Sequence, residues 1–223
     1  MARIIVLALT ALCCAGCQCK WTDASWEPRI GSQVVYQEAC VERSPGPVSV
    51  MPESNPPVPL TALCLPFEIE QAMNDRHQVG KELGRMVWKN WVGLRVFPRF
   101  VFLEDQRWKD RDQALALAKE QGLDLVVRGR VPYYLNGGTQ GVTSMSMVVD
   151  IYDVDSGEVI WSFDHAGRVE HFLDQDYILF NRKSRMPESP VWTVANVLAV
   201  DMGKPVKAWN HCWDWRRELD AFY

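Results

Sequence analysis

The strongest structural signal in this sequence is the stretch of residues 122–168, in which apolar and polar side chains alternate along most of the length. Such a period of two places successive side chains on opposite faces of a β-strand. Two runs of turn-forming residues divide the stretch, NGGTQG at 136–141 and DSGE at 155–158. The pattern therefore predicts three antiparallel strands joined by two hairpin turns.

Two strand–helix units are expected before these strands. In the first unit, the run ALCLPFEI at 62–69 predicts a strand near a sheet edge, because it contains a proline. Apolar residues at spacings of three and four between Val79 and Trp91 then predict a helix over about 75–92.

The second unit covers residues 97–122. Phe97–Leu103 predicts a strand. The helix that follows begins at Asp110 or Asp112, whose carboxylate can accept a hydrogen bond from an N–H group of the first turn. Gly122 is well placed to end this helix in the left-handed conformation.

The chain after residue 168 is less regular. HFLDQDYILF at 171–180 is interpreted either as a loop packed on the core or as a short helix. An apolar stripe along Val191–Met202 predicts a helix that Gly203 and Pro205 stop. We therefore predict an α/β fold, a β-α-β-α-β-β-β-α sandwich with a mixed sheet and helices packed on it. An extra C-terminal helix is expected in a tryptophan-rich extension over residues 204–223.

The N-terminus resembles a bacterial lipoprotein signal peptide. A short positive region precedes Ile4–Leu12, an apolar segment too short to span a bilayer, and CAGC follows at 14–17. Cleavage would remove residues 1–16 and leave acyl chains on Cys17, which is enough for stable anchoring. A plain secretory signal with a free Cys17 and an uncleaved helix are the alternatives.

Residues 17–60 are expected to form an acylated cysteine followed by a proline-rich tether. SPGP at 44–47 and MPESNPPVPL at 51–60 keep the backbone extended and remove donors that a sheet would need. A short strand at Gln33–Tyr36 interrupts the tether. Gln18 replaces the aspartate that marks inner-membrane retention in enterobacterial-type sorting, so the resemblance points to the periplasmic face of the outer membrane.

Export to an oxidising periplasm allows disulfides to form. With Cys17 acylated, four thiols remain in the mature chain, and they allow three pairings. They are Cys19, Cys40, Cys64 and Cys212. Cys64 lies in an apolar strand pattern, where a buried free thiol and a bridge both remain open. If one disulfide forms, we expect it to join Cys40 and Cys212.

The motifs around residues 122–168 resemble those of a bacterial envelope domain. They are GLDLVVRGRV at 122–131, the glycine-rich turn, and VTSMSMVVDIYDVDSGEVIWS at 142–162, before a closing helix. Over residues 61–203 the chain is similar to the domain shared by the TolB N-terminal region, LpoB, CsgG and PelC. The resemblance implies a lipid-anchored protein that binds other envelope proteins or self-assembles into a homo-oligomer, without shared catalytic residues. The chain lacks a long amphipathic hairpin, so a CsgG-like pore is not expected.

No catalytic or metal-binding pattern stands out in the sequence. The histidines are scattered and no serine lies in a GxSxG motif. They are His77, His165, His171 and His211. Glu104–Asp105 with Asp110 and Asp112 could be paired carboxylates of a glycosidase, but a loop and a helix start explain them better. A hairpin turn explains DSGE better than a calcium loop does, and NGGTQG is followed by strand alternation and not by the helix of a phosphate-binding loop. Cys212 with His211 lacks zinc-site spacing. We expect no enzyme, no cofactor and no metal.

The function that we expect is a role and not a reaction. The net charge of −4 and the lack of a dense basic run argue against a nucleic-acid partner. We predict an outer-membrane-anchored periplasmic lipoprotein that binds or assembles with a secretion, polysaccharide-export or cell-wall-synthesis machine without catalysis. The alternative is a periplasmic hydrolase or ligand-binding lipoprotein.

The partner surface is expected on the mixed face of the first long strand, on its rim, and in the C-terminal extension. Its residues are Arg128, Arg130, Tyr133, Tyr134, Trp213, Trp215 and Arg216. Tryptophan and arginine are enriched among the residues that dominate binding energy. A second interpretation of the C-terminal aromatics is a helix that covers the core.

Overall fold

The computed structural model describes residues 33–171, 175–176 and 180–211, and these fall into two compact units. The smaller unit runs to Cys40 and includes Phe172–Arg185. The larger unit comprises Val41–His171 together with the chain from Met186 onward. Each unit has a sheet of its own.

In the smaller unit, β11 (Phe180–Arg185) lies between β1 (Gln33–Glu38) and β10 (Gln175–Asp176). β11 is parallel to β1 and antiparallel to β10. The strand predicted at Gln33–Tyr36 is confirmed and continues to Glu38. The prediction of a loop or short helix for residues 171–180 is wrong at the residues of this range that the structure describes, since residues 175, 176 and 180 belong to strands. These strands form by pairing with each other and with β1, which is distant in sequence, so the local pattern could not show them.

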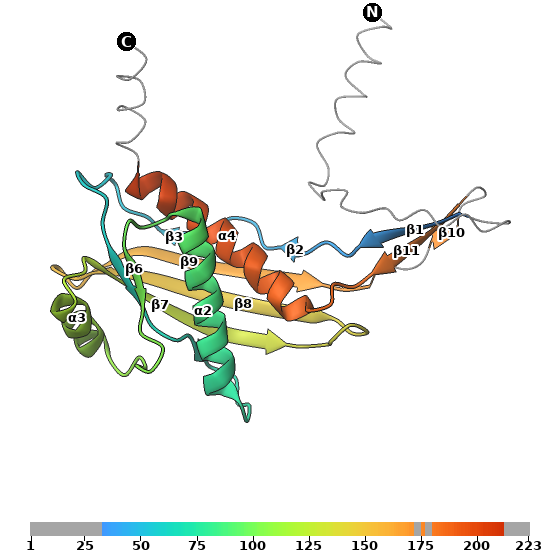
Figure 1. The fold of residues 1–223 in the computed structure, drawn as a ribbon, viewed down its shortest axis with the longest axis horizontal. Helices are drawn as coiled ribbons and strands as arrows, with labels where there is room; N and C mark the ends of the chain where they lie inside the picture. The colour runs from blue at the N-terminus through green and yellow to red at the C-terminus, as the bar shows by residue number, and fades with distance from the viewer. Residues whose placement is uncertain (1–32, 172–174, 177–179, 212–223) are drawn as a thin grey trace, which may run out of the picture. The chain divides into compact units, whose positions relative to one another are not determined.

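An eight-stranded mixed sheet forms the centre of the larger unit (Figure 1). Its strands are β2 (Glu42–Arg43), β3 (Val48–Val50), β4 (Ala62–Cys64), β5 (Glu68–Ile69), β6 (Phe100–Phe102), β7 (Leu125–Leu135), β8 (Thr143–Asp153) and β9 (Val159–Val169). The order across the sheet is β2-β9-β8-β7-β4-β6, with β3 also on β9 and β5 also on β7. β4 is parallel to β6 and β7, whereas β7, β8 and β9 are antiparallel.

The described helices of this unit are α2 (Arg76–Leu94), α3 (Arg111–Glu120) and α4 (Pro190–Asn210). Figure 1 shows α2 and α4 side by side across the sheet. The order β4, α2, β6, α3, β7, β8, β9, α4 confirms the predicted β-α-β-α-β-β-β-α α/β sandwich and its mixed sheet, to which short strands are added. The extra C-terminal helix was expected in the extension over residues 204–223, of which 212–223 lie outside the described residues.

The two faces of the sheet are covered by different helices. On one face, alternate side chains of β7, β8 and β9 are buried under α2 and α4, and Gly167 lies against Val194 and Leu198 of α4. On the other face, Val126 and Tyr152 belong to a core cluster with residues of α3. α3 covers only this end of the second face, because the cluster reaches no further along β7 and β8.

The predicted ends of α3 are confirmed. The side chain of Asp110 accepts a hydrogen bond from the backbone N–H of Gln113 at 2.7 Å, so Asp110 is the N-cap. Gly122 has φ of 62° and follows the C-cap residue Gln121. Glycine takes this left-handed conformation without the steric cost that a Cβ would add.

The predicted stop of α4 at Gly203 and Pro205 is wrong, because the helix continues to Asn210 with Pro205 inside it. A proline in a helix interior costs about 3 kcal/mol. Packing offsets that cost, since Met202, Val206 and Asn210 continue the buried stripe of the helix. Gly203 serves close packing, because a Cβ there would lie 2.8 Å from the Nε1 of Trp91.

Residues 41–60, which we call the strap, are part of the larger unit and differ from the predicted free tether. β2 and β3 pair with β9 along the strap. Further on, the Nε1 of Trp209 donates to the carbonyl of Ser54 at 2.7 Å. The prolines of the strap lie outside β2 and β3, so they remove no donor from the ladder. The compact unit therefore begins at Val41 and not at Thr61.

Candidate functional site

The second face of the sheet, beyond the area covered by α3, is the candidate functional site, and we call it the open face. It consists of Arg128, Arg130, Tyr133 and Leu135 on β7, Ser144, Ser146, Val148 and Asp150 on β8, and Ser162, Asp164, Ala166 and Arg168 on β9. Most of these side chains are half-buried or exposed, and most of those on β8 and β9 are small. The result is a flat area of small side chains with larger groups along its β7 side.

The part of the open face next to α3 is charged and internally paired. Arg128 donates to Glu68 at 2.8 Å, and its guanidinium lies 4.4 Å from the ring centroid of Trp108. Burial lowers the pKa of Arg128, but hydrogen bonds to Glu68 and Tyr152 outweigh it and raise the pKa above the usual value. A guanidinium that is charged, stacked and paired in this way is fixed in position.

Arg130 forms the second charged row. Its guanidinium lies 3.5 Å from Glu70 and 3.1 Å from Asp150, whose side chain is only 9% exposed. Ser162 donates to the other oxygen of Asp150 at 2.7 Å. Arg128 and Arg130, which we predicted as partner contacts, thus already have carboxylate partners within the chain, and they are better suited to hold the edge of a binding area rigid than to supply free charge.

The part of the open face toward the glycine-rich turn carries two exposed apolar side chains. Tyr133 is 47% exposed and Leu135 is 42% exposed, and their strand neighbours are Ser146 and Ser144. A register shift between residues 130 and 133 of β7 places Tyr133 on this face. A large aromatic and a leucine beside small polar residues form a surface that a partner can cover without displacing internal contacts.

Tyr134 points away from the open face, since it is level with the buried Met145. Its backbone N–H donates to the side chain of Gln71 at 3.0 Å. Burial raises the pKa of the Tyr134 phenol, and a hydrogen bond to Asn136 opposes this rise in part. Of the four predicted residues on β7, Tyr133 therefore offers the most accessible side chain.

The remaining predicted site residues fall mostly outside the described residues. They are Cys17, Cys212, Trp213, Trp215 and Arg216. Cys40 is disulfide-bonded, and its pairing with Cys212 stays a prediction. Cys64 is a buried free thiol, and burial raises its pKa.

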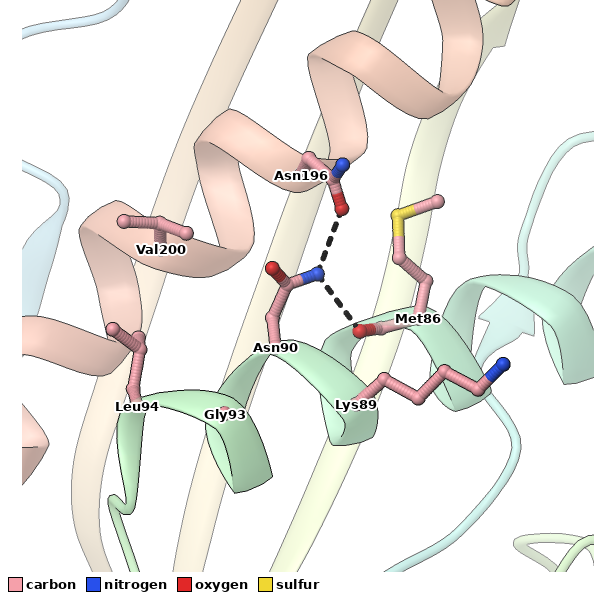
Figure 2. A pocket seen from close by; sticks show the side chains of 7 residues that line it. All are labelled: Met86, Lys89, Asn90, Gly93, Leu94, Asn196 and Val200. Carbon is pink, nitrogen blue, oxygen red and sulfur yellow. Dashed lines mark hydrogen bonds between the residues drawn. The ribbon is translucent and has the colours of Figure 1, made fainter.

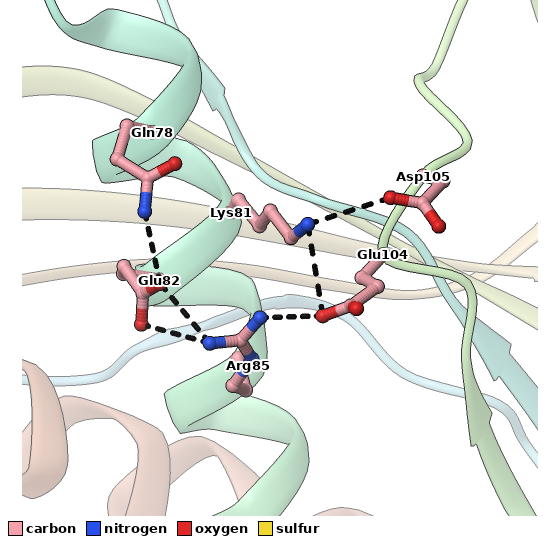
Figure 3. A network of polar contacts seen from close by, with 6 residues as sticks. All are labelled: Gln78, Lys81, Glu82, Arg85, Glu104 and Asp105. Atoms are coloured by element: carbon pink, nitrogen blue, oxygen red, sulfur yellow. Dashed lines mark hydrogen bonds and ion pairs between the residues drawn. The ribbon is translucent and has the colours of Figure 1, made fainter.

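The carboxylates that could have served glycoside chemistry are engaged with cations. Figure 3 shows Glu104 between Lys81 and Arg85, at 3.7 Å from the Nζ of Lys81. Asp105 lies 3.5 Å from the same Nζ. The hydrogen bond from Arg85 and the charge of Lys81 lower the pKa of Glu104. Glu104 is thus held ionised, which is the wrong state for the general acid of a glycosidase.

Lys81, Glu104 and Asp105 line a cavity of about 460 Å³ between the start of α2 and β5. Trp108, Phe67 and Ile69 also line it. Arg128 and Tyr152 both contact the ring of Trp108, so this cavity adjoins the charged end of the open face.

Sequence reasoning missed a hydrogen-bonded series at the strap, because its members are distant in sequence. The Oγ of Ser44 lies 3.0 Å from the Nδ1 of His165, and the Nε2 of His165 lies 3.3 Å from Asp201. Arg43 also pairs with Asp201 at 3.0 Å. The residue types are those of a serine hydrolase, but His165 is only 2% exposed and the Ser44 Oγ accepts the N–H of Ala166. The series fastens the strap to β9 and α4.

None of the helices in the described ranges is both long enough and apolar enough to cross a bilayer. Within the same ranges, no three histidine, cysteine or carboxylate side chains gather as metal ligands would.

No family model and no curated protein sequence matches this chain. Among solved structures, the chain is similar to the PelC dodecamer from Paraburkholderia phytofirmans, with 15% identity over 76% of this chain and 99% of that chain and a TM-score of 0.48. It is also similar to the hypothetical protein CT253 from Chlamydia trachomatis, with 11% identity over 68% and 98% of the two chains and a TM-score of 0.44. The LpoB C-terminal domain from Salmonella enterica matches at 14% identity over 49% and 82%, with a TM-score of 0.27. PelC and LpoB are two of the proteins that the sequence resemblance names.

Proposed function

We propose that this chain is a periplasmic lipoprotein, anchored through Cys17 in the outer membrane, that binds or assembles with a cell-envelope machine without performing chemistry. The partner is an envelope protein of a secretion, polysaccharide-export or cell-wall-synthesis complex, or a second copy of the chain within such an assembly. The partner covers the open face.

The apolar part of the open face is the observation that carries this proposal. Tyr133 and Leu135 are both more than 40% exposed, and burying this apolar surface against a partner is favourable. The ion pairs of Arg128 and Arg130 lie next to these two side chains on β7 and hold this part of the strand in place before a partner binds. Rigid aromatic anchors beside paired charged groups are typical of the residues that dominate binding energy at interfaces.

Two arrangements of polar residues support a role without catalysis. A hydrogen bond to histidine is what a catalytic serine needs, but His165 is only 2% exposed and the Ser44 Oγ already accepts the N–H of Ala166, so the pair serves packing better than attack on a substrate. Glu104 and Asp105 are neutralised by Lys81 and Arg85. Both arrangements stabilise the fold, and each would have to be broken before its members could act on a substrate.

The binding proposal is tested by photo-cross-linking in intact cells. We expect p-benzoyl-phenylalanine in place of Tyr133 to give a discrete cross-linked product that mass spectrometry identifies as an envelope protein or a second copy. Val92 on α2 is the matched control, because it is 44% exposed on a different surface. Equal products from both positions, or none from Tyr133, would contradict the proposal.

The anchoring proposal has a separate test, so that the two can fail independently. The Cys17→Ala variant is expected to lose palmitate labelling and to leave the membrane fraction. Unchanged labelling would refute the anchor and leave the open face untouched, because Cys17 is remote in sequence from β7.

A further inference from the structure

A shallow apolar groove runs between α2 and α4, on the side of the helices away from the sheet. Figure 2 shows its lining, in which Asn90 of α2 and Asn196 of α4 meet across the floor at 2.7 Å. The other lining residues are Met86, Lys89, Gly93, Leu94 and Val200, and the cavity measures about 420 Å³. The Nδ2 of Asn90 donates to the Oδ1 of Asn196 and to the carbonyl of Met86, and the remaining lining apart from Lys89 is apolar.

Two further observations extend this apolar surface. Trp192, which is 37% exposed, lies one helical turn before Asn196 on α4, so it continues the line of groove residues along that helix. At Gly93 a Cβ would meet no atom within 4 Å, so the floor of the groove is open there. An exposed tryptophan next to an open apolar groove indicates a surface that is normally covered.

The chain carries a segment whose pattern fits such a groove. Residues 212–223 read CWDWRRELDAFY. In a helix, Trp215, Leu219 and Phe222 would share one face at spacings of four and three, whereas Trp213, Arg217 and Asp220 would lie on the other. A segment with this pattern has an apolar stripe that requires a partner surface.

The connection has the right length. α4 ends at Asn210, ten residues after Val200, which corresponds to about 15 Å of helix. Residues 212–223 would span about 18 Å as a helix and about 40 Å if extended. As a helix, the segment can therefore turn back at the end of α4 and cover the Val200 end of the groove, at the high effective concentration that a short covalent connection provides.

We propose that the chain's own C-terminal segment, residues 212–223, docks in the groove between α2 and α4 with Trp215, Leu219 and Phe222 facing inward. The docked segment would then lie beside α2 and α4 on one side of the sheet, and the open face on the opposite side would remain accessible to a partner. This docking is independent of the function proposed above.

The test uses the full mature chain with p-benzoyl-phenylalanine at Lys89, an exposed position on the rim of the groove. We expect irradiation to join residue 89 to residues 212–223 within one chain, as peptide mass spectrometry shows. A mixture of isotopically heavy and light protein separates links within a chain from links between chains. A product only between chains, or no product in residues 212–223, would overturn the proposal.

Two tryptophans provide a matched pair of variants. Trp215→Ala removes an inward-facing anchor and is expected to lower the yield of the intrachain product by about fivefold or more. Trp213→Ala makes the same chemical change on the opposite helical face and is expected to leave the yield unchanged. Equal effects of the two substitutions would overturn the proposed orientation and with it the docking.

Gly93→Leu tests the groove without changing the segment. The new side chain enters open space, so far-UV circular dichroism is expected to stay unchanged. It occupies the floor of the groove, and the cross-link yield is expected to fall as it does in Trp215→Ala. An unchanged yield in a folded Gly93→Leu protein would show that the segment does not use this groove.

Discussion

Asn210 gives the sharpest prediction, because a single side chain joins three parts of the larger unit. It is completely buried at the end of α4. Its Oδ1 accepts the N–H of Leu60 at 2.8 Å, and its Nδ2 donates to the carbonyls of Leu60 at 3.1 Å and Val96 at 3.0 Å. The end of the strap and the loop after α2 are thereby fastened to α4.

The expected cost of Asn210→Ala follows from these three hydrogen bonds. Each contributes about 1 kcal/mol net to stability, and a buried group that loses its partner costs about 1–3 kcal/mol. Both polar groups of Leu60 lose this partner, whereas the Val96 carbonyl keeps the Nε2 of His211 at 3.1 Å. We therefore expect the free energy of unfolding to fall by about 3 kcal/mol.

Urea denaturation followed by tryptophan fluorescence measures this change. With a slope of about 2 kcal/mol per molar urea, the midpoint should fall by roughly 1.5 M. Asn55→Ala is the matched control, because the Asn55 side chain is exposed and makes one hydrogen bond, to the carbonyl of Trp209; its cost should stay below about 1 kcal/mol. If Asn210→Ala were no more destabilising than Asn55→Ala, the role that we assign to Asn210 in holding the strap would be refuted.

Three other predictions concern packing, charge and thiol reactivity. Gly80→Ala should lower the free energy of unfolding by about 2 kcal/mol or more, because its Cβ would lie 2.1 Å from a backbone oxygen. Gly93→Ala, whose Cβ would meet no atom within 4 Å, should instead stabilise α2 by about 0.5 kcal/mol. Calorimetry of both variants measures the two changes. Carboxyl NMR titration should show Glu104 still ionised below the usual pH range of a glutamate, because its pKa is lowered. Its contribution to stability is therefore present above the unfolded-state pKa and is lost as the pH falls through the folded-state pKa. Arg85→Gln should move the pKa of Glu104 back up. Burial raises the pKa of Cys64, so maleimide should modify this thiol in urea but not in the native protein at pH 8, as peptide mapping would show.

The sequence predicted the elements whose causes are local. The alternating pattern located β7, β8 and β9, and the periodic apolar residues located α2 within about two residues at each end. The cap at Asp110 and the left-handed Gly122 were predicted because each acts within one helical turn of its own position. The open face could also be anticipated, since Arg128 and Arg130 fall on the mixed side of the alternation.

The features that the sequence did not predict depend on contacts between distant residues. Pro205 has the local signature of a helix end, but buried residues on both sides of it continue to pack, and this packing outweighs its cost. The strap has the composition of a tether, but it is fastened by Ser44 to His165 and by Leu60 to Asn210, pairs separated by 121 and 150 residues. Tyr133 was predicted on the surface together with Tyr134, but the register shift between Arg130 and Tyr133 decides which of the two shares the open face, and Pro132 is the only local sign of that shift.

The position of the strap also sets how far from the membrane a lipid anchor at Cys17 would let the larger unit lie. With a tether that ended at Thr61, the 44 residues from Cys17 (61 − 17) could extend to about 150 Å. The larger unit begins at Val41, so 24 residues remain (41 − 17), with a maximum reach of about 80 Å. The contacts of Ser44 and Asn210 therefore shorten the largest distance between membrane and domain by nearly half.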